Sequence, residues 1–171
     1  MPVNGFTNGC CYDPLVSNER LLPAALRTRS SFALIKLAAL ARLECTRQLA
    51  AVGLSQHQHA ILCCLDEHGP ACQKDIAGRL GIDGGDIVAF IDGLQGQGLV
   101  VRERDQRDRR RQILTITPDG TRRLREAESL LDKAEPGPLA ALSPAQRTAL
   151  HQTALQVLTE HDPAAWRAGP Q

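Results

Sequence analysis

Residues 73–120 read QKDIAGRLGIDGGDIVAFIDGLQGQGLVVRERDQRDRRRQILTITPDG, and this stretch decides the fold. It opens with a short amphipathic segment that Gly81 closes. A second apolar pattern with helical spacing runs from Asp83 to Gln97, and Asp83 is a suitable N-cap for it. Two short helices joined by a tight glycine-containing turn are typical of a helix-turn-helix.

The apolar pattern changes its period at Gly98. From there apolar and polar residues alternate, which predicts strands over 99–104 and 112–117. The seven residues between them, 105–111, are highly charged and predict the tip of a hairpin. A two-stranded ribbon directly after a helix-turn-helix is a wing.

Longer helices flank this unit on both sides. One is expected over 19–52, with an apolar stripe that includes Leu34 and Leu49. Ser55 and Gln58 form a capping-box pattern that starts another, and Ser143 with Gln146 repeats it near the end of the chain. The segment 118–135 is also predicted to be helical, with Pro118 at its first position.

The sequence therefore predicts a mainly α fold with a small β-wing, a winged helix-turn-helix carrying N- and C-terminal dimerisation helices. The expected organisation is a flexible tail over 1–18, dimerisation helices over 19–53 and 121–162, a winged helix-turn-helix DNA-binding domain over 54–120, and a tail over 163–171.

Composition narrows the class of protein only slightly. The formal net charge is +1, which decides nothing about nucleic acid, but six of the 20 basic residues are arginines between Arg102 and Arg111. No secretory signal or membrane-spanning run is recognisable, so a cytoplasmic, nucleoid-associated protein without a membrane partner is expected. The six cysteines are then expected to be reduced thiols.

Three local motifs resemble the MarR family of winged helix-turn-helix transcriptional regulators. They are Leu54-Ser55-x-x-Gln58-x-x-Ile61-Leu62, Leu94-x-x-x-Gly98-Leu99-Val100, and Asp105-x-x-Asp108-Arg109-Arg110 followed by Leu114-Thr115-Ile116-Thr117-Pro118-x-Gly120. The resemblance covers roughly residues 20–160. It implies a homodimer on a pseudo-palindromic operator in double-stranded DNA, acting as a repressor, with a small-molecule effector as a candidate partner and no cofactor.

The charged hairpin supplies the first group of predicted DNA contacts. The resemblance implies that Arg110 enters the minor groove and that Asp108 stabilises the wing, while the remaining arginines suit phosphate. The second helix of the motif brings no positive charge, because no Lys or Arg occurs from Asp83 to Val101. Its acidic residue Asp86 would repel phosphate unless it accepts a hydrogen bond from a cytosine amino group. The DNA-binding candidates are Gln73, Lys74, Gly84, Gly85, Asp86, Ala89, Arg104, Arg107, Arg109, Arg110 and Arg111.

Histidines and cysteines gather in and just after the helix that is predicted to start at Ser55. Spacing of i, i+4 can hold zinc, although the spacing matches no standard zinc motif and favours core or surface roles. The candidates for a metal site are His57, His59, Cys63, Cys64, His68 and Cys72. Cys45 lies on an apolar stripe and Cys10-Cys11 in the tail, so a thiol switch has equally little support.

Two alternatives to a ligand-responsive regulator remain open. One is a metal- or thiol-redox-sensing regulator on the same fold. The other is a degenerate winged helix acting as a protein-interaction module, which the acidic second helix of the motif favours. An enzyme is not expected, because no glycine-rich phosphate loop, nucleophile motif or metalloprotease motif occurs.

Overall fold

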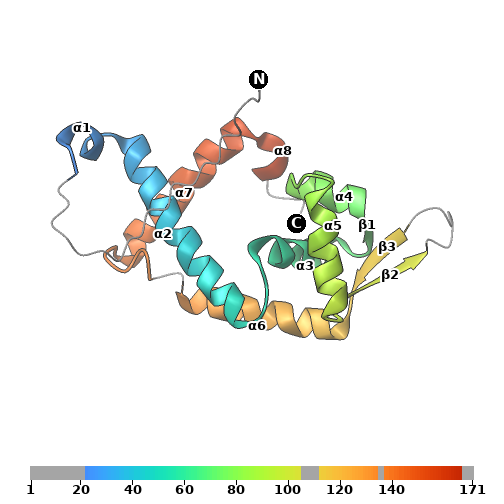
Figure 1. Cartoon of the computed structure of the whole chain (residues 1–171). Coiled ribbons are helices and arrows are strands. Elements are labelled where there is room, and N and C mark those ends of the chain that lie inside the picture. Colours follow the sequence, from blue (N-terminus) through green and yellow to red (C-terminus); the bar gives the residue numbers. More distant parts are fainter. Residues whose placement is uncertain (1–21, 105–111, 135–136, 167–171) are drawn as a thin grey trace, which may run out of the picture. The chain divides into compact units, whose positions relative to one another are not determined.

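The computed structural model describes residues 22–104, 112–134 and 137–166 (Figure 1). The chain divides into two compact units, residues 1–36 and 37–171. The elements are α1 (Ala24–Arg27), α2 (Ser30–Ala51), α3 (Gln56–His68), β1 (Ala71–Cys72), α4 (Gln73–Leu80), α5 (Asp86–Gly96), β2 (Val100–Arg104), β3 (Gln112–Ile116), α6 (Pro118–Ala134), α7 (Pro144–His161) and α8 (Pro163–Trp166).

Both predicted capping boxes are confirmed. The Ser55 hydroxyl accepts from the Gln58 backbone N–H at 3.2 Å, while the Gln58 side chain accepts from the Ser55 N–H at 2.9 Å. Ser143 and Gln146 repeat the arrangement at 3.3 Å and 2.9 Å. Each box satisfies two N–H groups that a helix start leaves without partners, so these two helices begin where the sequence predicts.

The helix expected over 19–52 is wrong in its first part. Helix α1 starts only after Pro23, and the residue before a proline is disfavoured in helical conformation. Between α1 and α2, the Thr28 hydroxyl donates back to the Ala24 carbonyl at 3.1 Å. Such side-chain bonds compete with the helical ladder, and α2 restarts at Ser30.

The predicted start of the second motif helix at Asp83 is also wrong. Helix α5 begins at Asp86. The Asp83 carboxylate accepts from the Gly85 N–H at 2.7 Å, which is a bond within a turn and not a cap on the helix. The Asp83 carbonyl accepts from the Ile87 N–H at 3.1 Å, so the turn leads directly into the helix.

The predicted wing strands are present, but the sheet has a third strand that the sequence did not reveal. Strands β2 and β3 pair antiparallel from Val100↔Ile116 to Arg104↔Gln112. The two-residue strand β1 pairs with the other edge of β3, so the order is β1-β3-β2. The wing is thereby anchored beside α4, which follows β1 without a gap.

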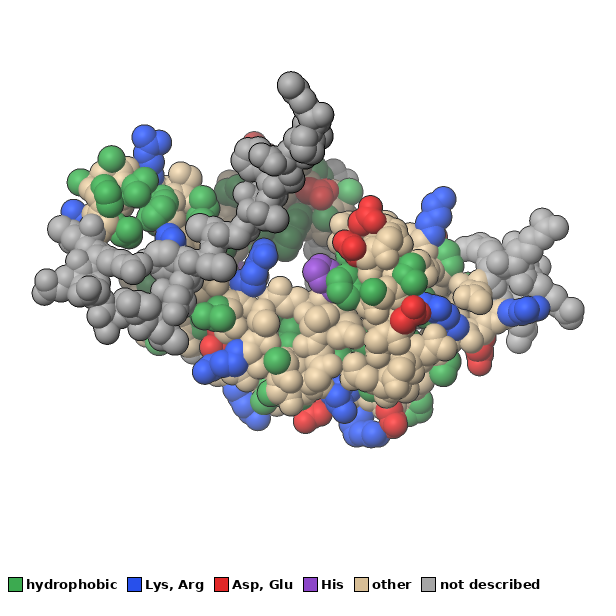
Figure 2. Space-filling model, viewed as in Figure 1, with side chains coloured by type: hydrophobic (Ala, Val, Ile, Leu, Met, Phe, Trp, Pro, Cys, Tyr) green, Lys and Arg blue, Asp and Glu red, His purple; other side chains and the backbone are tan. Residues whose placement is uncertain are grey.

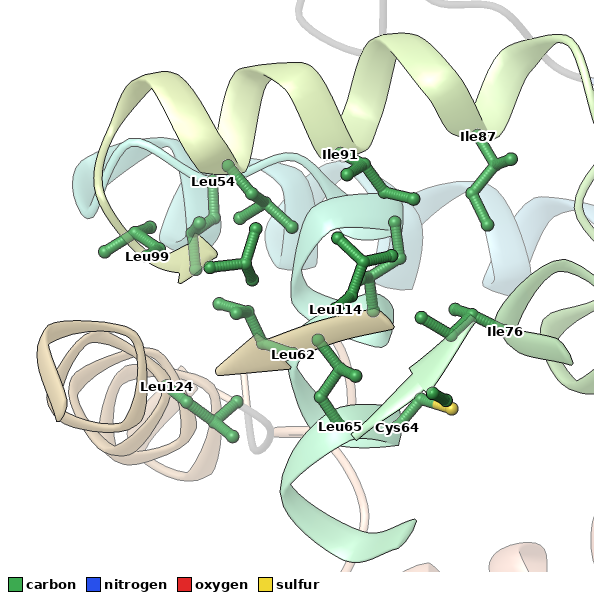
Figure 3. Packing of buried hydrophobic residues seen from close by; sticks show 14 of the residues in the cluster. Leu54, Leu62, Cys64, Leu65, Ile76, Ile87, Ile91, Leu99, Leu114 and Leu124 are labelled. Atoms are coloured by element: carbon green, nitrogen blue, oxygen red, sulfur yellow. The ribbon is translucent and has the colours of Figure 1, made fainter. Parts of the chain in front are cut away.

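The core lies between α3, α4, α5 and the sheet (Figure 3). Ile87 and Ile91 point from α5 toward Leu114 of β3, and Ile76 closes the layer from α4. Helix α6 adds Leu124, which is fully buried. For α4 and α5 these are the faces that the helical periodicity predicts to point inward, because an amphipathic helix buries one stripe of its surface.

The outer helices keep much of their apolar surface exposed. On α2, Leu40 is 46% exposed and Leu43 54% exposed, and Leu49 is the buried residue of that helix. On α7, Val157 is 51% exposed and Leu158 37% exposed. Within the part of the chain that the structure describes, no helix combines the length and apolarity needed to cross a membrane.

Candidate nucleic-acid interface

Helix α5 has one buried and one exposed face, and four of the predicted site residues lie on the exposed face or in the turn that precedes it. Ile87, Ile91 and Leu94 are buried in the core. Gly84 and Gly85 lie in the exposed turn, Asp86 is the first helical residue, and Ala89 is exposed one turn later. The structure therefore brings these four together at the N-terminal end of one helix.

The exposed face of α5 is apolar and acidic. Val88, 38% exposed, stands between Asp86 and Ala89. The Asp86 carboxylate makes no hydrogen bond or ion pair with another described residue, and Asp86 is exposed. Figure 2 shows basic and acidic side chains interspersed among the described residues of the face in view, without one continuous basic patch.

Positive charge comes from the elements beside α5. Lys74 is exposed in the first turn of α4 and Gln73 next to it is half-buried. Arg79, which the sequence analysis did not single out, is exposed in the last turn of the same helix. Arg104 is exposed at the end of β2, opposite Gln112.

The predicted hairpin tip falls outside the described residues. Arg107, Asp108, Arg109, Arg110 and Arg111 all belong to the segment 105–111. The structure supplies the two positions that hold this segment, because Arg104 and Gln112 are paired across β2 and β3.

One ion pair joins the wing to α5. The Arg102 guanidinium lies 2.5 Å from the Asp92 carboxylate, and Arg102 is half-buried while Asp92 is exposed. The pair compensates one acidic charge on the exposed face of α5. Sequence reasoning missed it because the two residues belong to different elements and no helical or strand spacing relates them.

The histidine and cysteine candidates are dispersed. His59 Nε2 and Cys63 Sγ approach to 3.5 Å on α3. His57 stacks on Phe90 with ring centroids 4.5 Å apart, whereas Cys64 is buried in the core. His68 is exposed at the end of α3, and Cys72 is the residue before α4. Among the described residues, no group of three or more His, Cys, Asp or Glu side chains is arranged to hold a metal ion.

Burial also determines the protonation of the His59–Cys63 pair. It raises the pKa of the Cys63 thiol to about 11, and the carboxylates of Glu128 and Asp66 add to the rise. It lowers the pKa of His59, against a smaller opposing effect of Glu128. At neutral pH the pair is therefore a thiol beside a neutral imidazole, and a thiol is a poor nucleophile and metal ligand compared with a thiolate.

A cleft of about 330 Å³ lies between the second half of α2 and the end of α6. Hydrogen bonds from Gln48 and Arg47 hold the pKa of Glu44 below its ordinary value, so this carboxylate stays charged and pairs with Arg47 at 2.8 Å. Lys133 lines the same cleft without an ion pair to any described residue. The wall is therefore polar and carries one uncompensated cation.

A helix-turn-helix with an exposed second helix, followed by a β-wing, defines the winged helix-turn-helix class of nucleic-acid-binding domains. The MarR family model matches residues 54–111. A protein assigned to transcriptional regulation of the hcr operon in Thauera aromatica is 33% identical over 78 residues, which cover 46% of this chain and 47% of that protein. The chain thus spans about half the length of this curated relative.

Solved structures extend the similarity to most of the chain. The transcriptional repressor CouR bound to a 23-mer DNA duplex is 30% identical with a TM-score of 0.73, covering 81% of this chain and 99% of that one. CouR from Rhodococcus jostii RHA1 bound to p-coumaroyl-CoA is 23% identical with a TM-score of 0.67, covering 87% and 100%. This chain belongs to the MarR family of transcriptional regulators, which are not enzymes.

Proposed function

We propose that the chain is a homodimeric transcriptional repressor that binds a pseudo-palindromic operator in double-stranded DNA. The observation that carries the proposal is the exposed N-terminal end of α5 beside a wing whose tip is rich in arginine. In this role residues 54–120 bind DNA, and 19–53 with 121–162 form the dimer. The DNA-bound repressor CouR, similar over most of the chain, supports the same arrangement.

The DNA contacts divide between reading bases and holding phosphates. Gly84, Gly85, Asp86 and Ala89 enter the major groove, where the small residues let the backbone approach closely and Asp86 accepts from a base amino group. Phosphates are bound from the neighbouring elements by Gln73, Lys74, Arg104, Arg107, Arg109 and Arg111. Arg110 occupies the minor groove, and Asp108 orients the wing tip.

The exposed apolar side chains of α2 and α7 support the dimer. Leu40, Leu43, Val157 and Leu158 together present aliphatic surface that one chain leaves in contact with water. Exposed apolar surface of this extent marks protein interfaces. A second copy that covers these helices would bury well above about 2,000 Å², as obligate interfaces do.

An anionic small molecule is the effector class that the α2–α6 cleft favours. Its volume is within the range of small-molecule sites, and Lys133 offers a cation that no described residue neutralises. The related structure of CouR with p-coumaroyl-CoA supports an effector response in this chain. A small molecule in the cleft would shift the equilibrium between the DNA-bound and the free conformation only if it binds one of them more tightly than the other.

Two measurements test the proposal. Selection of duplexes from fragmented genomic DNA at low salt should recover sequences with two inverted half-sites, and sedimentation at micromolar concentration should show a dimer. Leu43→Glu with Val157→Glu should give a monomer that binds the duplex far more weakly. Gln152→Glu, at an exposed polar position on α7, adds one negative charge where the double variant adds two, and it should change neither result.

A monomeric wild type would contradict the dimer. Absence of DNA binding at low salt would contradict the regulator and favour a protein-interaction module.

A further inference from the structure

Three elements meet at the C-terminal end of α2. The Val52 carbonyl accepts a hydrogen bond from Arg123 Nη1 of α6 at 2.5 Å. The next residue, Gly53, has a left-handed backbone with φ of +71°. A Cβ atom added at Gly53 would lie 3.5 Å from Arg123 Nη1 and 3.7 Å from Gln97 Oε1. The end of α2 is therefore bonded to Arg123 of α6, and the glycine that follows it is also approached by the side chain of Gln97.

The hydrogen bond from Arg123 to the Val52 carbonyl is partly shielded from solvent. Val52 is buried, and Arg123 is partly buried with its Nε 3.6 Å from Glu126. Hydrogen bonds from a charged donor are roughly twice as strong as neutral ones, and the low exposure strengthens this one further. A carbonyl past the end of a helix is left without an intrahelical donor, and Arg123 supplies it from a residue 71 positions away.

Helix α2 has few other contacts that fix its direction, and one of them is a hydrogen bond of 3.4 Å from Gln56 Nε2 to the Arg42 carbonyl. Leu49 is its buried residue, and Cys45 one turn earlier packs partly against the core. From Leu37 to Ala51 the helix is about 22 Å long at about 1.5 Å per residue. A rotation of about 10° at Val52 would displace the far end of that segment by about 4 Å, which exceeds the roughly 3.4 Å rise of one base pair.

We propose that Arg123 is a positioning residue that fixes the direction in which α2 leaves the winged helix, and so sets the half-site spacing that the dimer accepts. The inference rests on the proposed function, because α2 determines the separation of two recognition helices only in a dimer formed through it. In this role Arg123 does not contact DNA. It holds the dimerisation helix at a constant angle to α6, and Gln97, the C-cap of α5, approaches the glycine that follows Val52.

The chain offers a matched control on the same helix. Arg122 is exposed and pairs with Asp119 at 2.7 Å within α6. Arg123→Met and Arg122→Met remove the same charge, but only the first removes the donor to Val52. Any effect of net charge on DNA affinity should therefore be common to both variants.

The experiment compares wild type, Arg123→Met and Arg122→Met on duplexes selected by the wild-type protein from a random-sequence pool. The best duplex is resynthesised with the half-sites moved one or two base pairs closer or further apart, and once with a single half-site. Arg123→Met should keep the affinity of its control for the single half-site. It should lose about tenfold on the best spacing and discriminate less among the others, because avidity depends on simultaneous engagement.

Three results would overturn the inference. One is a spacing profile of Arg123→Met identical to that of Arg122→Met. Another is an equal loss on every duplex with a lowered melting temperature, which indicates structural support alone. The third is a wild type that is monomeric or indifferent to spacing, which refutes the proposed function as well and is visible without any variant. If Arg123→Met does not fold, Arg123→Gln, polar but shorter, is compared with Arg122→Gln by the same criteria.

Discussion

Asp92 of α5 and Arg102 of β2 form an ion pair of 2.5 Å that joins α5 to the base of the wing. The pair has two effects that mutation can separate. It holds the base of the wing against the helix, and in the proposed complex it neutralises a carboxylate on the side of α5 that approaches DNA. Because Asp92 is more than half exposed, solvent screens the attraction and its contribution to stability is small.

We therefore expect opposite effects on DNA affinity from the two partners. Asp92→Asn should strengthen binding by up to about fivefold at low salt, because Arg102 becomes available to phosphate. Arg102→Gln should weaken it by a similar factor, since Asp92 then stands uncompensated. Binding titrations at several salt concentrations measure both, with unfolding free energies expected within about 1 kcal/mol of wild type. Equal effects of the same sign would contradict this account.

Among the described glycines, Gly120 is the one at which an added methyl group should lower the stability of the fold most. A Cβ atom there would clash with the Leu99 carbonyl oxygen and would lie 2.8 Å from Ile116 Cγ1, where α6 begins against the wing. Gly120→Ala should lower the free energy of unfolding by about 3 kcal/mol or more, because the close neighbour is backbone and cannot yield cheaply. Denaturant unfolding measures the loss.

Gly96→Ala is the control for Gly120→Ala. It lies in α5 with no atom within 4 Å of the added Cβ, so it should be neutral or stabilising by up to about 1 kcal/mol. Comparable losses in the two variants would show that the contact with Leu99 is unimportant.

Arg110→Ala tests the wing, and its prediction comes from the charge distribution of the sequence. Helix α5 contains no Lys or Arg, so the wing must supply much of the electrostatic affinity. The variant should lose about 1–3 kcal/mol per half-site and show a flatter dependence of affinity on salt. Its melting curve should match wild type. The control is Arg122→Ala, on α6 and paired with Asp119, which should leave the DNA affinity nearly unchanged. If folded Arg110→Ala binds DNA as tightly as wild type, Arg110 does not contact the minor groove.

The raised pKa of Cys63 predicts how stability depends on alkaline pH. In the unfolded chain the thiol ionises near its ordinary pKa of 9.0, whereas in the folded chain its pKa is about 11. The contribution of this thiol is thus fully present below pH 9.0 and is lost as pH rises toward 11. Cys63→Ser should show a shallower fall of unfolding free energy across that window, and an identical slope would contradict the burial of the thiol.

Oxidation should leave DNA binding largely intact. Cys63 is a protonated thiol at neutral pH, Cys64 is buried, and Cys45 packs against the core. Reactive sensor cysteines are instead exposed thiolates. Operator affinity before and after peroxide treatment tests this, with Cys63→Ser treated in parallel. A loss of about tenfold or more that a thiol reductant reverses would reveal a switch.

Local signals in the sequence determined where most elements begin and end. Ser55 with Gln58, and Ser143 with Gln146, specify helix starts because the bonds of a capping box join residues three positions apart. The alternation after Gly98 likewise specified both wing strands, since side chains in a strand alternate between its two faces. The same reasoning failed at Asp83, where a bond to the Gly85 N–H competes with a bond that would cap the helix.

The sequence by itself therefore determined the family and, apart from β1, the order and the apolar faces of the winged helix-turn-helix elements, because these follow from spacings of a few residues. Only the tertiary structure decided which charges meet. Arg102 pairs with Asp92 across two elements, and Arg123 bonds to the carbonyl of Val52, 71 residues away. The strand β1 is likewise defined by a partner some forty residues further along the chain. Periodicity records which face of an element is apolar but not which element lies against it, so contacts between distant residues arise only when the chain packs.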